Sequence, residues 1–139
     1  MALSRWVSPL RMLCILAPVA ACSTDPGELV DVSGTVTGLV RSSQGEAVPG
    51  AEVTVVAIAP EALRLRVVDS AAGLADAGGR YTILVRAMLP APGPVLLRVH
   101  ARPPATSPLA TRESLGATLR LGGAPDTAGI DFFLPYLPD

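Results

Sequence analysis

The chemistry open to this chain is limited by how few nucleophilic and metal-binding side chains it contains. His100 is the only histidine among 139 residues, and it alternates with Arg98 on the outward side of a predicted strand. A zinc site with nitrogen and sulfur ligands, or a facial triad of two histidines and a carboxylate, needs more ligands than this. No Gly-x-Ser-x-Gly segment presents a serine nucleophile to His100. We therefore expect no catalytic residue, no metal site and no cofactor.

Four aspartates are the remaining candidates for binding a cation. They are Asp69, Asp76, Asp126 and Asp131. Calcium prefers oxygen ligands, but the spacing of these aspartates matches no calcium-binding loop. Aspartates in turns commonly accept hydrogen bonds from nearby backbone N–H groups. We expect this backbone role rather than calcium binding.

Arginine side chains form the first candidate contact surface. Five of them alternate outward on predicted strands, at Arg64, Arg66, Arg86, Arg98 and Arg120. If those strands adjoin, the arginines form a basic stripe that suits acidic polysaccharide or lipid A. The alternative is that they are solvated charges that discourage strand edges from pairing.

Aromatic side chains near the C-terminus form the second candidate contact surface. Phe132 and Phe133 are adjacent, so in a strand they point to opposite faces and one of them can be exposed. Together with Tyr136, the exposed ring would make a small contact patch. Combining the two groups, we predict a contact patch that includes Arg98, His100, Phe133 and Tyr136.

The N-terminal residues have the pattern of an export signal. Arg5 and Arg11 precede the apolar run Met12–Ala21, whose ten residues are too few for a stable transmembrane helix. The sequence VAAC at residues 19–22 then resembles a bacterial lipobox, in which an aliphatic residue and two small residues precede a cysteine. In proteins with this motif, the thiol is joined to diacylglycerol and the chain is cut before the cysteine. An ordinary secretory signal, with a cysteine at its end by chance, is the alternative.

The lipobox resemblance implies a lipoprotein signal peptide over residues 1–21, lipidation of Cys22 and a tether over residues 22–31. Two or three acyl chains hold a protein firmly on a membrane. Ser23 stands where an aspartate would favour inner-membrane retention, so we expect the outer membrane of a Gram-negative-type bacterium. Cys14 leaves with the signal, so the mature domain has no thiol for a disulfide or a nucleophile.

Charge and composition narrow the remaining function classes. Cleavage before Cys22 removes two of the 11 arginines and leaves 12 acidic residues, so the formal charge of −3 gives no support to nucleic-acid binding. Hydrophobic residues make up 50% of the chain but aromatic residues only 4%, so the core must be aliphatic. The 13 glycines and 14 prolines favour turns and extended segments over long helices.

Alternating apolar and polar residues predict seven short strands. We place them at residues 32–41, 51–59, 63–68, 80–86, 95–101, 115–121 and 130–134. Residues 70–79 are interpreted as a link of small residues, and the proline-rich residues 102–111 as a surface loop. No segment offers the amphipathic helix that joins parallel strands. The prediction is an all-β fold, a seven-stranded β-sandwich over residues 32–139.

Several motifs resemble a carboxypeptidase regulatory-like domain. The first comprises Gly38-Leu39-Val40, Gly45 and the sequence VPGAEV at residues 48–53. The second is ADAGGRY at residues 75–81, with Ala75 where the family usually has threonine, and Ile130-Asp131-Phe132 suits the last strand. The resemblance implies a transthyretin-like (prealbumin-like) sandwich that serves as an accessory module, with its motif residues in structural roles. Isopeptide-bonded adhesin domains are also similar, but their Lys–Asn bond is excluded because this chain has neither residue.

The combined prediction is a lipid-anchored, non-enzymatic module of the cell envelope that acts as a structural or protein-binding accessory. Its expected partners are the membrane, through Cys22, and an envelope protein or polysaccharide. The alternative function is a surface lipoprotein that binds a polysaccharide or another ligand through the arginines or the C-terminal aromatic residues.

Overall fold

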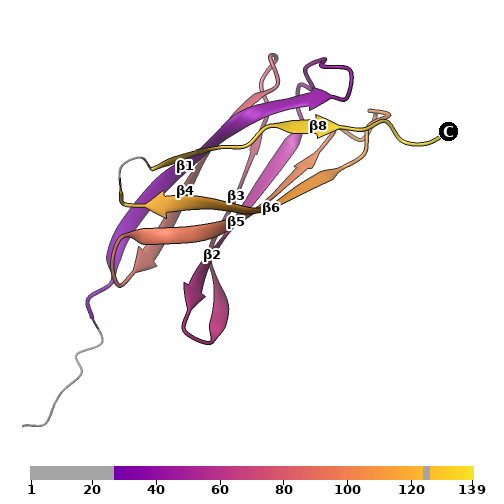
Figure 1. Ribbon diagram of the computed structural model, residues 1–139. Coiled ribbons are helices and arrows are strands. Elements are labelled where there is room, and N and C mark those ends of the chain that lie inside the picture. The colour runs from indigo at the N-terminus through magenta and orange to yellow at the C-terminus, as the bar shows by residue number, and fades with distance from the viewer. Residues whose placement is uncertain (1–26, 124–125) are drawn as a thin grey trace, which may run out of the picture.

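The alternating segments of the sequence form eight strands in the computed structural model, which describes residues 27–123 and 126–139 (Figure 1). The strands are β1 (Val30–Ser42), β2 (Glu52–Glu61), β3 (Arg64–Leu74), β4 (Arg80–Leu89), β5 (Gly93–Arg102), β6 (Arg112–Leu121), β7 (Thr127–Gly129) and β8 (Phe132–Leu134). The described residues contain no helix.

The strands make two sheets that pack face to face. In the first sheet, β1 pairs antiparallel with β4 on one side and parallel with β7 and β8 on the other. The second sheet has the antiparallel order β3-β2-β5-β6. Alternate residues of both sheets point inward, as in the pattern of β4, where every second side chain is buried. The predicted all-β sandwich is confirmed.

The core between the sheets is aliphatic, as the composition predicts. Tyr81 and Phe132 are the only aromatic side chains among the buried hydrophobic residues that the structure describes. Val53 on β2 is fully buried, and Ile83 on β4 is 3% exposed. Stability therefore depends on the packing of valine, leucine, isoleucine and alanine.

Strand pairing near the C-terminus is interrupted beside Gly38 of β1, between the end of β7 and the start of β8. Tyr81, the cross-strand partner of Gly38, reaches over it and donates a hydrogen bond from its hydroxyl to the carbonyl oxygen of Ile130 at 2.5 Å. A Cβ on Gly38 would overlap that carbonyl oxygen, so only glycine fits. The Asp131 carboxylate accepts the N–H of Leu39 at 2.9 Å. We call these four residues, Gly38, Tyr81, Ile130 and Asp131, the Gly38 junction; because of it, the strand predicted at 130–134 is shortened to β8 and preceded by β7.

The third strand differs from the prediction in length. β3 continues to Leu74, so the prediction of a link is wrong for residues 70–74. The backbone of Ser70–Leu74 pairs with Glu52–Val56 of β2, although its small side chains give no clear alternation. Backbone pairing to a neighbour therefore extends the strand where side-chain pattern alone does not.

The side chains of β3 also face differently from the prediction. Leu65 and Val67 pair with Pro60 and Ile58 and lie on the outer face of the second sheet, where both are exposed. The Arg66 side chain points to the other face and forms an ion pair with Glu61. Because β2 and β3 extend beyond the core, neither face of this hairpin is covered by the first sheet.

The loops gather at two ends of the sandwich (Figure 1). At the N-terminal end lie the start of β1, the β2–β3 turn (62–63) and the β4–β5 turn (90–92). At the C-terminal end lie the β1–β2 loop (43–51), the β5–β6 loop (103–111) and the C-terminal segment (135–139). The long strand β1 connects the two ends.

Candidate functional site

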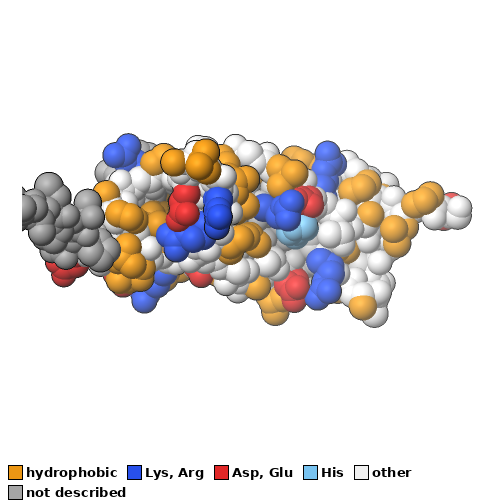
Figure 2. Space-filling view, turned by 90° about the horizontal axis from the view of Figure 1, so that it is seen from below, with side chains coloured by type: hydrophobic (Ala, Val, Ile, Leu, Met, Phe, Trp, Pro, Cys, Tyr) orange, Lys and Arg blue, Asp and Glu red, His pale blue; other side chains and the backbone are white. Residues whose placement is uncertain are grey.

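Arg98 and His100 lie side by side on the outer face of the β3-β2-β5-β6 sheet, as the alternation of β5 predicts. Glu113 of β6 is the cross-strand partner of His100. Its Oε1 lies 3.0 Å from Nε of Arg98, and its Oε2 lies 3.7 Å from Nδ1 of His100. Figure 2, in which histidine is pale blue, shows this face with acidic and basic side chains next to each other. The charge of Arg98 is therefore already compensated by Glu113.

Phe133 lies at the open edge of the sandwich, on β8. It is 52% exposed, whereas Phe132 is 3% exposed, so the two rings point in opposite directions as expected. The guanidinium of Arg112 donates a hydrogen bond to the Phe133 carbonyl oxygen at 3.2 Å. Phe133 and Glu113 both line a shallow pocket of about 270 Å³ between β6 and β8. Glu113 thus contacts the Arg98–His100 pair and shares a pocket with Phe133.

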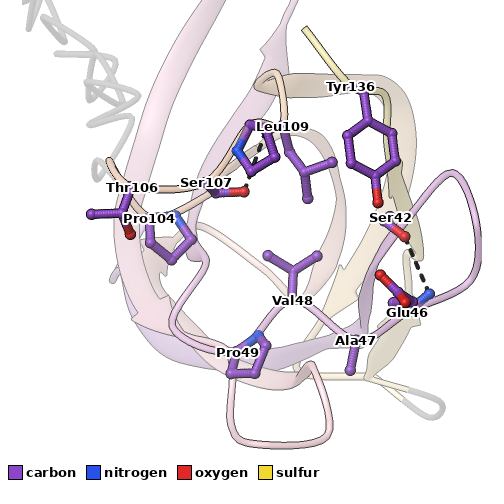
Figure 3. Close-up of a pocket in the computed structure, with 11 residues that line it drawn as sticks. Ser42, Glu46, Ala47, Val48, Pro49, Pro104, Thr106, Ser107, Leu109 and Tyr136 are labelled. Carbon is purple, nitrogen blue, oxygen red and sulfur yellow. Dashed lines mark hydrogen bonds between the residues drawn. The ribbon is translucent and has the colours of Figure 1, made fainter.

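Tyr136 lines a different pocket, of about 330 Å³, at the C-terminal end of the sandwich (Figure 3). Three segments that are far apart in the sequence form it: the end of β1 with the β1–β2 loop, the β5–β6 loop and the C-terminal segment. Its walls include Ser42, Glu46, Val48, Pro49, Pro104, Thr106, Ser107, Leu109 and Tyr136. We call it the Tyr136 pocket. The structure therefore does not bring Tyr136 together with Arg98 and His100.

Backbone hydrogen bonds hold the C-terminal segment against the β5–β6 loop. Tyr136 forms a bridge with Leu109. On either side of it, the N–H of Ala110 donates to Pro135 and the N–H of Leu137 donates to Pro108, both at 2.8 Å. These bonds place the Tyr136 ring over the loop, so the pocket wall is ordered by main-chain contacts.

The two serine hydroxyl groups of the Tyr136 pocket accept hydrogen bonds from within the chain. Ser42 is 2% exposed, and its Oγ accepts the N–H groups of Gln44 and Glu46 at 3.3 and 3.2 Å. Oγ of Ser107 accepts the N–H of Leu109 at 3.3 Å. In Figure 3 the Tyr136 hydroxyl points toward the side of the pocket where Ser42 and Glu46 lie, while proline rings form the opposite side.

This arrangement suits binding by contact rather than covalent chemistry. The serine oxygens accept backbone hydrogen bonds that order the loops, and no histidine lines the pocket to act as a base. Proline, valine, leucine and tyrosine side chains offer an apolar surface with one polar rim. Such a pocket can receive an apolar side chain of a partner.

Three of the four aspartates, Asp69, Asp76 and Asp131, accept backbone N–H groups, as expected. Oδ1 of Asp76 accepts two N–H groups of its own turn at 2.9 Å, and Asp131 accepts the N–H of Leu39. Asp69 accepts the N–H of Arg86 at 2.8 Å and so links β3 to β4. Within residues 27–123 and 126–139, no group of three or more His, Cys, Asp or Glu side chains is placed to hold a metal ion.

The environment of Tyr81 clearly changes the acidity of its hydroxyl group. Burial raises the pKa of its hydroxyl far above the ordinary tyrosine value, and the negative charge of Asp131 raises it further. The neutral hydroxyl donates to the Ile130 carbonyl. The structural role expected for Tyr81 from the family resemblance agrees with this position.

The condition for an arginine stripe, that the strands carrying the five arginines adjoin, is not met. Arg86 is on β4, in the other sheet from Arg98 and Arg120, and Arg66 is paired with Glu61. Sequence alternation places a side chain on one face of its strand, but it does not say which strands share a sheet. For this reason the sequence alone leaves open whether the five arginines lie together.

The Tyr136 pocket is the main feature that sequence reasoning missed. From the sequence, Val48 and Pro49 are assigned only to a family motif, and Pro104 and Leu109 only to a surface loop. The proline-rich composition of residues 102–111 was the one local signal. Cys22 and the predicted signal peptide lie outside the described residues.

Comparisons with known proteins do not assign the chain to a family. No family model matches the chain, and no curated protein matches it. Among solved structures, the chain is similar to a streptococcal ancillary pilin, with a TM-score of 0.42 and 12% sequence identity. The match covers 78% of this chain and 30% of the pilin chain. Across the described part of the chain, no helix has the length and hydropathy needed to span a membrane.

Proposed function

We propose that this protein is a lipid-anchored, non-enzymatic module of the bacterial cell envelope that binds a protein partner through the Tyr136 pocket. The observation that carries the proposal is the position of the pocket. It lies at the far end of β1 from the predicted lipidation site, and β1 has 13 residues. At about 3.3 Å per residue, the strand spans about 43 Å.

The proposed domain plan has three parts: a signal peptide over residues 1–21, lipidated Cys22 with its tether over residues 22–31, and the sandwich over residues 32–139. Eight residues, Cys22–Leu29, separate the lipid from the first strand. At 3.3–3.6 Å each, they reach at most about 29 Å. The pocket would therefore face away from the membrane, where an envelope protein can reach it.

The family that we propose for the sandwich is the carboxypeptidase regulatory-like group. The family motifs have structural positions: Gly38 and Tyr81 belong to the Gly38 junction, and Ala51 is fully buried. Accessory modules of this kind mediate contacts, which agrees with a module that has a pocket and no apparent nucleophile. This assignment supports a binding role over an enzymatic one.

The apolar walls of the pocket favour a protein partner over a polysaccharide. Polysaccharide recognition commonly relies on exposed aromatic platforms, and Tyr136 is the single aromatic side chain in the pocket. The other candidate for acidic glycans, Arg98, is compensated by Glu113. An apolar side chain of a partner would gain about 25 cal/mol for each Å² that it buries in the pocket.

Site-specific crosslinking in cells tests the proposal. A photoreactive amino acid at Thr106, on the pocket rim, should capture one dominant envelope protein, and Tyr136→Ala should abolish this capture. The matched control is the same group at Ala62, at the opposite end of the sandwich, which should not capture that protein. Capture that is unaffected by Tyr136→Ala would refute the pocket as the binding site. Binding to a glycan that is lost in Arg98→Ala would instead favour the polysaccharide-binding alternative.

The anchor is tested separately by Cys22→Ser. This substitution should release the protein from the membrane fraction because the thioether to diacylglycerol cannot form. The folded domain should otherwise be unchanged, which its thermal unfolding midpoint would check. An unchanged membrane fraction would refute the lipid anchor.

A further inference from the structure

Exposed apolar side chains gather at the N-terminal end of the sandwich. In the described part of the chain, twelve large hydrophobic residues are exposed, and six of them belong to this end. They are Leu29, Val30, Leu63, Leu65, Val67 and Met88. We call them the N-terminal apolar surface; Leu63, at the tip of the β2–β3 hairpin, is 97% exposed. Figure 2 shows hydrophobic side chains at this end, on the left, as well as along the rest of this face.

The fold does not require leucine at the hairpin tip. Glu61 pairs with Arg64, so Ala62 and Leu63 alone form the turn. Two-residue turns favour Asn-Gly or Asp-Gly because their usual geometries need positive φ angles. No non-glycine residue described in the structure has a positive φ, so this turn uses another geometry. A polar residue would suit this fully exposed position better in water.

The hairpin tip is continuous with the start of β1. Val30 pairs with Leu89 of β4, and Leu89 and Pro90 share a pocket of about 270 Å³ with Pro60 and Arg66 of the β2–β3 hairpin. The hairpin, the proline-containing β4–β5 turn and the first residues of β1 therefore form one end surface. The predicted tether leaves the sandwich from this surface.

We propose that the N-terminal apolar surface lies against the lipid bilayer, with Leu63 inserted at the boundary between headgroups and acyl chains. The proposal rests on the Cys22 anchor of the proposed function. A tether that reaches at most about 29 Å keeps this end next to the membrane at all times. Because the tether gives this surface a high effective concentration at the bilayer, even a small apolar contact is enough to bind it there.

The charges at this end indicate that the contact is apolar rather than electrostatic. Charges of both signs are present there among the described residues: Arg64, Arg66 and Arg120, with Glu28, Asp31, Glu61 and Asp126. One pair of them, Arg66 and Glu61, forms an ion pair. The balance predicts the same membrane contact with neutral and with anionic lipids.

Depth-dependent fluorescence quenching tests the contact. The lipidated full-length mature protein carries one free thiol when Ala62 is replaced by cysteine (Ala62→Cys), which leaves Leu63 in place. An environment-sensitive dye on this thiol should be quenched by nitroxide lipids in phosphatidylcholine vesicles, and its emission should shift to the blue. The matched control is Thr106→Cys at the opposite end, where the dye should remain unquenched. Adding phosphatidylglycerol should leave both results unchanged.

A second substitution assigns the effect to Leu63. In the Ala62→Cys background, Leu63→Ser should reduce quenching to the level at residue 106, whereas Leu115→Ser, an exposed leucine elsewhere on the same sheet, should not. Flotation with the vesicles but no quenching at residue 62 overturns the membrane contact and leaves the anchor intact. Quenching that requires phosphatidylglycerol overturns the apolar mode. Failure of the protein to float with the vesicles overturns the anchor, and this proposal with it.

Discussion

The fold requires the residues of the Gly38 junction, whereas it does not require the leucine at the β2–β3 turn. A Cβ on Gly38 would overlap the Ile130 carbonyl oxygen, and Tyr81 and Asp131 satisfy polar groups there by hydrogen bonds. Leu63 at the turn is almost fully exposed, and its backbone geometry does not call for leucine. The comparison teaches that conspicuous motif residues can be explained by folding alone. The residues that folding leaves unexplained are then the better guide to function.

The largest expected effect is that of Gly38→Ala. The added methyl group would meet the Ile130 carbonyl and the Tyr81 ring, so the backbone around Ile130 must move. We expect a loss of about 3–5 kcal/mol in the free energy of unfolding, measured by denaturant titration. The matched control is Gly129→Ala on β7, where no atom lies within 4 Å of the new Cβ and the change should be below about 1 kcal/mol. Equal losses in both variants would mean that the junction is not specifically packed.

The second expected effect contrasts the core with the hairpin tip. Ile83→Ala removes a buried side chain from the aliphatic core and should cost about 2–4 kcal/mol. Leu63→Ala removes a side chain of similar size from the exposed tip and should change stability by less than about 0.5 kcal/mol. Thermal unfolding midpoints of the two variants measure the difference. A comparable loss in Leu63→Ala would show that the tip contributes to folding and would remove the contrast.

Much of the sandwich was predictable because buried strands leave a period of two in the sequence. The alternation in residues 80–86 and 95–101 placed β4 and β5, and it correctly put Arg98 and His100 on an outer face. The adjacent aromatics Phe132 and Phe133 could be assigned to opposite faces by the same rule. These results depend only on local geometry, in which successive side chains point to opposite sides of a strand.

The remaining features depend on contacts between distant segments. The alternation of residues 63–68 is real, but Leu65 and Val67 lie on the outer face of the second sheet and are exposed, whereas Val68 of the same strand packs against the core. The break between β7 and β8 arises from a hydrogen bond between Tyr81 and Ile130, which are 49 residues apart. The Tyr136 pocket likewise needs three separate loops at one end. No local pattern in the sequence encodes these contacts between distant segments.

The third expected effect is that of Tyr81→Phe, which isolates one hydrogen bond of the Gly38 junction. Leaving the buried Ile130 carbonyl without its donor should cost about 1–2 kcal/mol at neutral pH. Because the folded-state pKa of Tyr81 is raised, its contribution is complete below the ordinary tyrosine pKa of about 10 and is lost as the pH rises above it. Denaturant titrations on both sides of pH 10 should show this alkaline loss in the wild type.

The alkaline loss should be smaller in Tyr81→Phe, since the group that must titrate on unfolding is absent. The matched control is Tyr136→Phe, which removes the hydroxyl of an exposed tyrosine and should leave the alkaline loss in place. An unchanged pH dependence in Tyr81→Phe would mean that other groups destabilise the protein in alkali. The raised pKa would then have no part in its stability.

The smallest expected effect on stability comes from replacing both residues of the β2–β3 turn, Ala62→Asn with Leu63→Gly. Asn-Gly favours a two-residue hairpin whose twist matches that of the strands, so stability should be unchanged or rise by up to about 1 kcal/mol. The thermal unfolding midpoint measures this effect. If folding had selected Ala62 and Leu63, the double substitution would lower the midpoint. If it does not, the fold does not need the exposed leucine. Because exposing an apolar side chain to water is unfavourable, we then expect Leu63 to have a role outside the folded domain.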